Sequence, residues 1–130
     1  MERNEKTRAL LAAFGCALAY LLAGKALTAV LPQVPEEAAR MWAFVHRCAA
    51  APIVEELVFR GIIQQLARPL GERQAVALQA VLFAVQHRGP AGMAYALVCG
   101  LVLGTLRSRT GSVWPGMLLH TLNNLLVFAA

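Results

Sequence analysis

The sequence predicts an all-α integral membrane protein, a bundle of about five transmembrane helices. Hydrophobic residues make up 58% of the 130 residues and charged residues only 15%, and the mean hydropathy is +0.57. This is more apolar than a soluble domain of the same size requires. Turn-forming and charged residues divide the chain into apolar segments, several of them long enough to cross a bilayer. The length accommodates one domain, so we expect a single domain over residues 1–130.

The apolar segments follow one another with short connections. The first, residues 9–31, is interrupted only by Lys25 and is predicted to be a leading membrane helix that ends at Pro32. A polar connection over residues 36–40 follows it. Residues 41–130 are predicted to hold the helices that carry the chemistry, in the segments 41–67, 74–87, 91–106 and 113–130, with turns at Pro69 and Gly71, Gly89 and Pro90, and Thr110 and Gly111.

The positions of Lys and Arg predict the topology, because cytoplasmic loops of membrane proteins are enriched in positive charge. Arg40 and Arg88 fall on one side of the five spans. Seven basic residues fall on the other side: Arg3, Lys6, Arg8, Arg68, Arg73, Arg107 and Arg109. We therefore expect a cytoplasmic N-terminus and a C-terminus outside. The short, Ala- and Arg-rich chain favours the inner (plasma) membrane of a bacterium.

Several function classes are disfavoured by composition. The formal net charge is +5, but the basic residues are scattered between apolar segments rather than gathered in a stripe, so we expect no nucleic-acid partner. The three cysteines lie far apart without a CxxC pair, which indicates neither a disulfide framework nor a zinc knuckle. Gly100 and Gly104 have the small-xxx-small spacing of helices that pack closely in lipid, so their segment is predicted to be a packing helix.

Three charged side chains stand close together within the segment 41–67, in the run Glu55-Glu56-Leu-Val-Phe-Arg60. At ~2.5 to 3.5 kcal/mol for each charge at mid-membrane, three unpaired charges would offset a large part of a domain's stability. Glu56 and Arg60 are spaced to form an ion pair on one helical face. Glu55 lies about 100° around the helix and is the carboxylate left to exchange protons near neutrality. Alternatively, a helix beginning at Pro52 would satisfy both carboxylates at its free N–H groups.

Two histidines and an asparagine add to this polar set. His87 ends the third apolar segment, while His120 and Asn124 stand four residues apart in the last one. One helical face therefore presents an imidazole and a carboxamide together. Either histidine alone would be interpreted as a hydrogen-bonded packing residue. Two histidines and Glu55 on three different apolar segments indicate one shared polar site, and we expect their side chains to converge.

These residues form three motifs whose order and internal spacing resemble those of the CPBP family, which includes CAAX prenyl proteases and bacteriocin-processing enzymes. The motifs are Glu55-Glu56-x-x-x-Arg60, Phe83-x-x-x-His87 and His120-x-x-x-Asn124. The similarity extends over about residues 51–128. It implies a helical membrane fold and an intramembrane endopeptidase. The roles that it implies are water activation by Glu55, a supporting ion pair of Glu56 with Arg60, assistance with water and proton transfer by His87 and His120, and oxyanion stabilisation by Asn124.

The family resemblance leaves the cofactor open. Glu55, His87 and His120 would form a two-His, one-Glu site for zinc or another divalent metal, with a position open to water, as a metalloprotease requires. The same residues would activate water directly in a glutamate-type protease. No HExxH motif occurs in the sequence, and we favour the metal-free route.

The leading functional hypothesis is hydrolysis of a peptide bond near the membrane surface, in the processing of a C-terminal tail or a peptide. The expected partners are membrane lipid and a peptide or protein substrate with a membrane-associated tail. Because relatives usually carry further spans, a homodimer or another partner is the expected source of a missing cavity wall. The alternative is a non-enzymatic bacteriocin-immunity or scaffold protein of the same fold. A transporter with Glu55 in a proton relay is disfavoured by the small number of spans.

Overall fold

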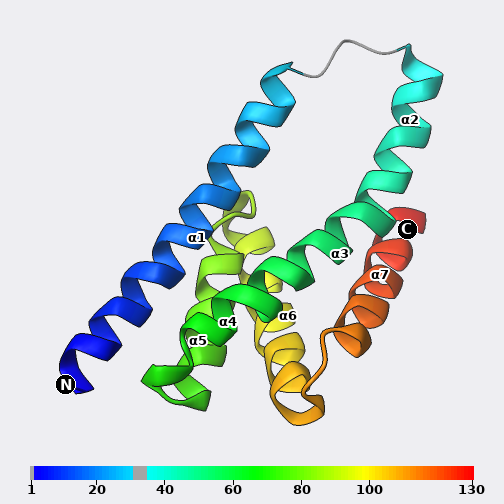
Figure 1. The fold of residues 1–130 in the computed structure, drawn as a ribbon. Helices are drawn as coiled ribbons and strands as arrows, with labels where there is room; N and C mark the ends of the chain where they lie inside the picture. The colour runs from blue at the N-terminus through cyan, green and yellow to red at the C-terminus, as the bar shows by residue number, and fades with distance from the viewer. Residues whose placement is uncertain (1, 31–34) are drawn as a thin grey trace.

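The chain folds into five helical stretches that run alternately up and down (Figure 1). The computed structural model describes residues 2–30 and 35–130, and within these ranges it contains helices and turns but no strand. The stretches are α1 (Glu2–Val30), a continuous helical stretch over residues 36–66, α5 (Glu72–Ala84), α6 (Gly89–Thr110) and α7 (Trp114–Ala129). The predicted all-α bundle of about five helices is confirmed.

The second stretch changes its winding along its length. It consists of α2 (Glu36–Val45), the π-helical η1 (His46–Ala50), α3 (Ala51–Glu55), the π-helical η2 (Glu56–Ile63) and α4 (Gln64–Leu66), and the 3₁₀ turn η3 (Arg68–Leu70) follows. π-helical turns inside α-helices are rare and are frequently found at functional sites. Here η2 begins with Glu56 and contains Arg60, so the unusual winding coincides with the charged motif.

Several predicted boundaries are wrong by a few residues. The polar connection predicted over 36–40 is helical, because Glu36 and Arg40 form an ion pair one turn apart and Pro35 directly precedes the first turn. Gly89 and Pro90, predicted as a turn, are the first two residues of α6, a position that proline favours. Leu31 and Pro32, where the leading helix was predicted to end, lie outside the described residues.

The remaining segments differ at their ends. Helix α1 begins at Glu2 rather than residue 9, since its charged first turns continue the apolar helix without a break. Helix α5 stops at Ala84, so His87 lies in the turn beyond it rather than at its last helical position. Helix α6 extends to Thr110 and ends at Gly111, whose φ of 69° is the left-handed conformation common after a helix.

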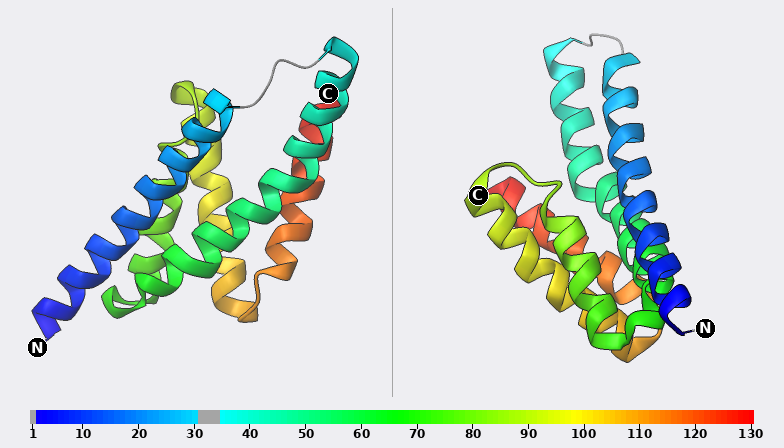
Figure 2. Two further views of the ribbon diagram at one scale, coloured as in Figure 1. Left: turned by 45° about the horizontal axis from the view of Figure 1, so that its top comes forward. Right: turned by 90° about the vertical axis from the view of Figure 1, so that its left-hand side faces the viewer.

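The arrangement places the two ends of the chain at opposite ends of the bundle (Figure 1). The beginning of α1, the turn between α4 and α5 and the turn between α6 and α7 share the lower end in Figure 1. The seven basic residues predicted for one side of the membrane lie in the first turns of α1, in η3, in the first turn of α5 or in the last turn of α6, all at this end. Figure 2 shows that α1 and the second stretch form one layer, against which α5, α6 and α7 lie.

Helices α5 and α6 pack with almost no space between their backbones. A Cβ added at Gly100 would lie 2.9 Å from both Cα and Cβ of Ala80. The side-chain amide of the buried Gln79 donates a hydrogen bond of 2.7 Å to the Gly100 carbonyl, and that of Gln64 donates one of 3.0 Å to the Gly104 carbonyl. The glycines thus permit both close packing and polar cross-links between helices, as their spacing indicated.

The surface of the bundle is suited to lipid rather than water. Helices α1 and α6 are each long and apolar enough to cross a membrane. Large apolar side chains are exposed along several helices, including Leu11, Leu118 and Leu126 at 69%, 74% and 65%. The accessible surface is 8734 Å², whereas a compact soluble monomer of this mass exposes roughly 6,700 Å². The excess apolar surface requires a covering that lipid provides.

A small aromatic core lies behind the charged motif. Phe59 is fully buried and packs edge-on against Phe83 at 5.1 Å and Tyr20 at 5.5 Å between ring centroids. Ile63, also fully buried, and the small residue Ala13 of α1 belong to the same cluster. Phe83 contacts both the Phe59 ring and the Arg60 guanidinium, so the aromatic core and the buried cation pack together.

The close contact at Gly100 predicts a sharp difference between two glycines of the same helix. Gly100→Ala should lower stability by ~1 to 3 kcal/mol, because the new methyl group meets backbone of Ala80 that cannot move aside. Gly92→Ala, where nothing lies within 4 Å of the added Cβ, should be neutral or stabilise by up to ~1 kcal/mol. Thermal unfolding of both variants in detergent measures this. Equal melting temperatures would contradict the packing of α5 on α6.

Candidate active site

A buried carboxylate, Glu56, lies at the centre of the polar residues. Its side chain is only 1% exposed. One oxygen, Oε1, lies 3.0 Å from Nη1 of Arg60 and 2.9 Å from Nδ1 of His120. Arg60 is itself fully buried. The i,i+4 spacing therefore produces the predicted ion pair, and a histidine from α7 joins it as a second partner.

The other oxygen of Glu56 packs against the first turn of α7. A Cβ added at Gly116 would lie only 2.7 Å from Glu56 Oε2. Among the described residues this oxygen has no hydrogen-bond partner, but it lies where a helix N-terminus presents free N–H groups and the positive end of its dipole. A glycine at this point lets the carboxylate approach the helix backbone.

Glu55 is the more accessible of the two carboxylates. Its side chain is 21% exposed, and its Oε2 lies 3.6 Å from Nε2 of His120. That separation is slightly too long for a direct hydrogen bond. His120 thus stands between both glutamates, with Nδ1 on Glu56 and Nε2 facing Glu55. Glu55 has no basic residue three or four positions away on its own helix, and the basic side chain beside it comes from α7.

His87 approaches the site from the turn after α5. Its Nδ1 lies 3.0 Å from the carbonyl oxygen of Phe83, and its ring contacts the Phe83 ring at 4.7 Å. The same phenyl ring lies 5.9 Å from the His120 ring and 4.5 Å from the Arg60 guanidinium carbon. Phe83 is therefore the apolar wall that three of the polar groups share.

Asn124 lies where α7 meets η1. Its Nδ2 donates a hydrogen bond of 2.8 Å to the backbone carbonyl of Arg47. In the π-helix η1, the Arg47 carbonyl would accept a hydrogen bond from the backbone N–H of the residue five positions later. That residue is Pro52, which has no backbone N–H. The amide of Asn124 therefore satisfies the acceptor that Pro52 leaves free. Its second N–H remains for other partners. Pro52 lies within the continuous stretch, so no helix begins there to satisfy the glutamates.

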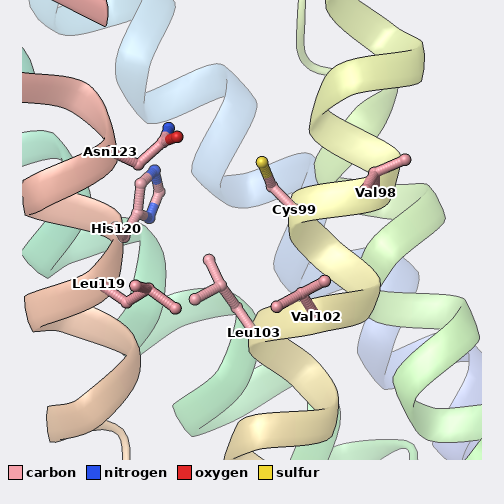
Figure 3. Close-up of a pocket in the computed structure, with 7 residues that line it drawn as sticks. All are labelled: Val98, Cys99, Val102, Leu103, Leu119, His120 and Asn123. Carbon is pink, nitrogen blue, oxygen red and sulfur yellow. The ribbon is translucent and has the colours of Figure 1, made fainter. Parts of the chain in front are cut away.

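A pocket of about 240 Å³ opens between α6 and α7 beside His120. Figure 3 shows Cys99 on α6 pointing across the pocket toward His120 on α7, with Asn123 one turn further along. The other lining residues are aliphatic: Val98, Val102, Leu103 and Leu119. The pocket therefore presents an apolar surface that leads directly to the imidazole.

Two polar residues at this pocket escaped the sequence reasoning. Tyr95 donates a hydrogen bond of 2.5 Å to Oδ1 of Asn123, and Asn123 lines the pocket together with His120. The spacing of three residues between His120 and Asn123 was the available signal, since residues i and i+3 also share a helical face. Tyr95 lies on α6 and has no motif spacing that could indicate it.

The arrangement does not fit a three-ligand metal site. Within the ranges that the structure describes, no three His, Cys, Asp or Glu side chains are gathered as a metal ion requires. His120 directs one ring nitrogen to each glutamate, and His87 directs Nδ1 to the Phe83 carbonyl. Only Glu55 and His120 of the three expected zinc ligands approach one another. We therefore derive no step through a metal.

The fold and these contacts define an all-helical membrane protein with a charged site enclosed by its helices. A comparison with protein-family profiles matches residues 37–126 to the type II CAAX prenyl endopeptidase Rce1-like family. The matched region includes every polar residue of the site and most of the bundle. The chain belongs to this family of membrane CAAX endopeptidases. Searches of curated proteins and of solved structures found no significant match.

The buried ion pair predicts a large stability difference between two arginines. Arg60→Ala should destabilise the fold by ~3 to 5 kcal/mol, since Glu56 would remain buried without its cation. Arg40→Ala is the matched control, because its i,i+4 partner Glu36 is 85% exposed and the loss should be below ~1 kcal/mol. Thermal unfolding and the yield of purified protein measure both. Similar losses for the two variants would show that the buried pair is not structural.

Proposed function

We propose that the chain is an intramembrane endopeptidase in which Glu55 activates the water that attacks a peptide bond. The observation that carries this proposal is the placement of His120 between a buried glutamate and an accessible one. Glu56 and Arg60 form the supporting pair, His87 and His120 assist with the water and the proton, and Asn124 supports the surrounding backbone. The single domain over residues 1–130 comprises the leading helix and the catalytic helices.

The contact with Glu56 selects one tautomer of His120. A carboxylate oxygen accepts a hydrogen bond, so Nδ1 carries the proton that points to Glu56. The neutral ring then presents an unprotonated Nε2 to the side on which Glu55 lies. A carboxylate that orients an imidazole in this way also stabilises the imidazolium that forms when Nε2 accepts a proton. Glu56 thus has a supporting role in proton transfer as well as in folding.

The proposed hydrolysis uses these groups in sequence. A water molecule beside Glu55 gives a proton to the Glu55 carboxylate while the water oxygen forms a bond to the carbonyl carbon of the peptide. The electron pair of the C=O bond moves to the carbonyl oxygen. Collapse of this intermediate re-forms the carbonyl and breaks the C–N bond as the leaving nitrogen takes up the proton. The developing oxyanion requires a donor. Asn124 retains one amide N–H for that purpose, and Asn123 carries a second amide at the pocket beside His120.

The surroundings of the site favour a substrate that reaches it from the membrane. The pocket beside His120 is lined mainly by aliphatic side chains, several of them exposed on the outer surface of the bundle. A peptide or protein with a membrane-associated tail matches this approach, with membrane lipid as the surrounding partner. We place the protein in the inner membrane of a bacterium with its N-terminus in the cytoplasm. A second copy of the chain is the proposed source of any further wall.

Replacement of Glu55 tests the chemical role of this carboxylate. Glu55→Gln keeps the shape of the side chain but accepts no proton from water, so turnover should fall at least ~100-fold. The melting temperature should stay the same or rise slightly, because a neutral amide is less costly to bury than a carboxylate. The measurement compares cleavage of peptides with a membrane-anchored tail and thermal unfolding, both in detergent.

The matched control is Glu37→Gln, which changes an exposed carboxylate of α2 and should leave both quantities unchanged. Undiminished cleavage by folded Glu55→Gln would remove Glu55 from the mechanism. Loss of folding in that variant would assign Glu55 a structural role. Wild-type protein that binds a partner peptide but cleaves none would favour the immunity or scaffold function instead.

A further inference from the structure

A wide cleft on the other side of the site carries charge that the proposed chemistry does not use. It has a volume of about 620 Å³ and lies between the second half of α1, the beginning of the second stretch and the turn between α5 and α6. In Figure 1, α1 and α2 extend past that turn at the upper end of the bundle and diverge from each other. The cleft therefore opens at the end of the bundle opposite to the N-terminus.

Four basic side chains from three separate parts of the chain line this cleft. Lys25 belongs to α1, His46 and Arg47 to η1, and Arg88 directly precedes α6. None of the four forms an ion pair in the described part of the chain, and no acidic side chain there lines the cleft. Three basic residues outside the cleft, Lys6, Arg40 and Arg68, each pair with a carboxylate four residues away.

Like charges held together without counter-charges raise the free energy of the folded state unless an anion neutralises them. Each guanidinium or ammonium group offers several N–H donors, and these bind carboxylate or phosphate groups most strongly. The cleft also includes apolar and amide side chains, such as Leu21 and Gln86. This mixture of cations, amide and apolar surface is suited to a peptide that carries an anionic group.

The cleft is continuous with the surroundings of the catalytic residues. Tyr20 lines it and packs edge-on against Phe59, which lies on the same helical stretch as Glu55. Arg47 lines it with its side chain, while its backbone carbonyl accepts the hydrogen bond of Asn124. Tyr20 and Arg47 therefore connect the cleft to the region of the site, although Glu55 itself does not line the cleft. A lipid headgroup bound only at the outer surface of the bundle would not require a connection between the cleft and the site.

We infer that the cleft binds a carboxylate of the substrate through Lys25, Arg47 and Arg88, and thereby sets a preference for acidic peptides. This inference rests on the proposed function, because it assigns the anionic group to the peptide that is cleaved. The carboxylate comes either from the C-terminus of the peptide or from an Asp or Glu side chain near the scissile bond. Both sources present the same group to the cleft.

Three matched peptides with the same membrane-anchored tail separate these sources. The first has neutral side chains and an amidated C-terminus, the second has a free C-terminal carboxylate, and the third has one Glu and an amidated C-terminus. Cleavage by the full chain in nanodiscs of neutral phospholipid should show a KM about tenfold lower for at least one acidic peptide than for the neutral one, as expected for a hydrogen bond to a charged group. Added salt should reduce this difference, because the cations are exposed.

The double variant Lys25→Gln/Arg88→Gln should raise the KM of the acidic peptide to that of the neutral peptide. The matched control is Arg109→Gln, which removes an exposed cation at the opposite end of the bundle and should keep the preference. Fluorescence anisotropy of labelled peptides with the Glu55→Gln protein provides a second readout that requires no turnover. Its dissociation constants should show the same order among the three peptides.

Equal KM and equal dissociation constants for the three peptides would overturn the inference. It would also fail if the double variant changed only the retention of an anionic phospholipid and left the peptides unaffected, since the cleft would then be a lipid headgroup site. Failure of the proposed function is distinguishable, because the wild type would cleave none of the peptides. In that case selective binding of acidic peptides that is lost in the double variant would still support a carboxylate site.

Discussion

The structure depends on one buried carboxylate and the requirement that it be compensated. Glu56 is nearly inaccessible, and an unpaired charge at such a position in a membrane would be strongly unfavourable. Arg60 compensates it from the same helix, and His120 approaches from α7. The Arg60 contact lies within η2, and the His120 contact joins α7 to the same carboxylate. The proposed catalytic arrangement is thus a consequence of satisfying one charge.

Other polar side chains between the helices are also satisfied by a partner on a neighbouring helix. Gln79 and Gln64 attach α5 and α4 to the backbone of α6 at the two glycines that permit close approach. Asn124 attaches α7 to the carbonyl that Pro52 leaves without a partner. Because lipid exerts no hydrophobic force between helices, such contacts and close packing hold the bundle together. Motif residues of the site therefore contribute to the fold and to the proposed chemistry at once.

The sequence was most informative where spacing along a single helix determines contact. The separation of Glu56 from Arg60 predicted their ion pair, and the apolar segments predicted the helices. Contacts between distant segments were harder to predict from the sequence. The spacing placed His120 and Asn124 on one helical face, but it did not indicate that His120 contacts Glu56 and that Asn124 contacts the Arg47 carbonyl. The π-helical turns and the Tyr95–Asn123 contact depend on tertiary packing, and no local pattern in the sequence indicates them.

The orientation of His120 is the most direct test of this account. The chain has three histidines, so ¹⁵N spectra of their rings in the folded protein in detergent are simple to assign with single replacements. The neutral ring of His120 should carry its proton on Nδ1, hydrogen-bonded to Glu56, and leave Nε2 unprotonated toward Glu55. A neutral His120 ring with its proton on Nε2 and none on Nδ1 would contradict the proposed link between the buried ion pair and the catalytic carboxylate.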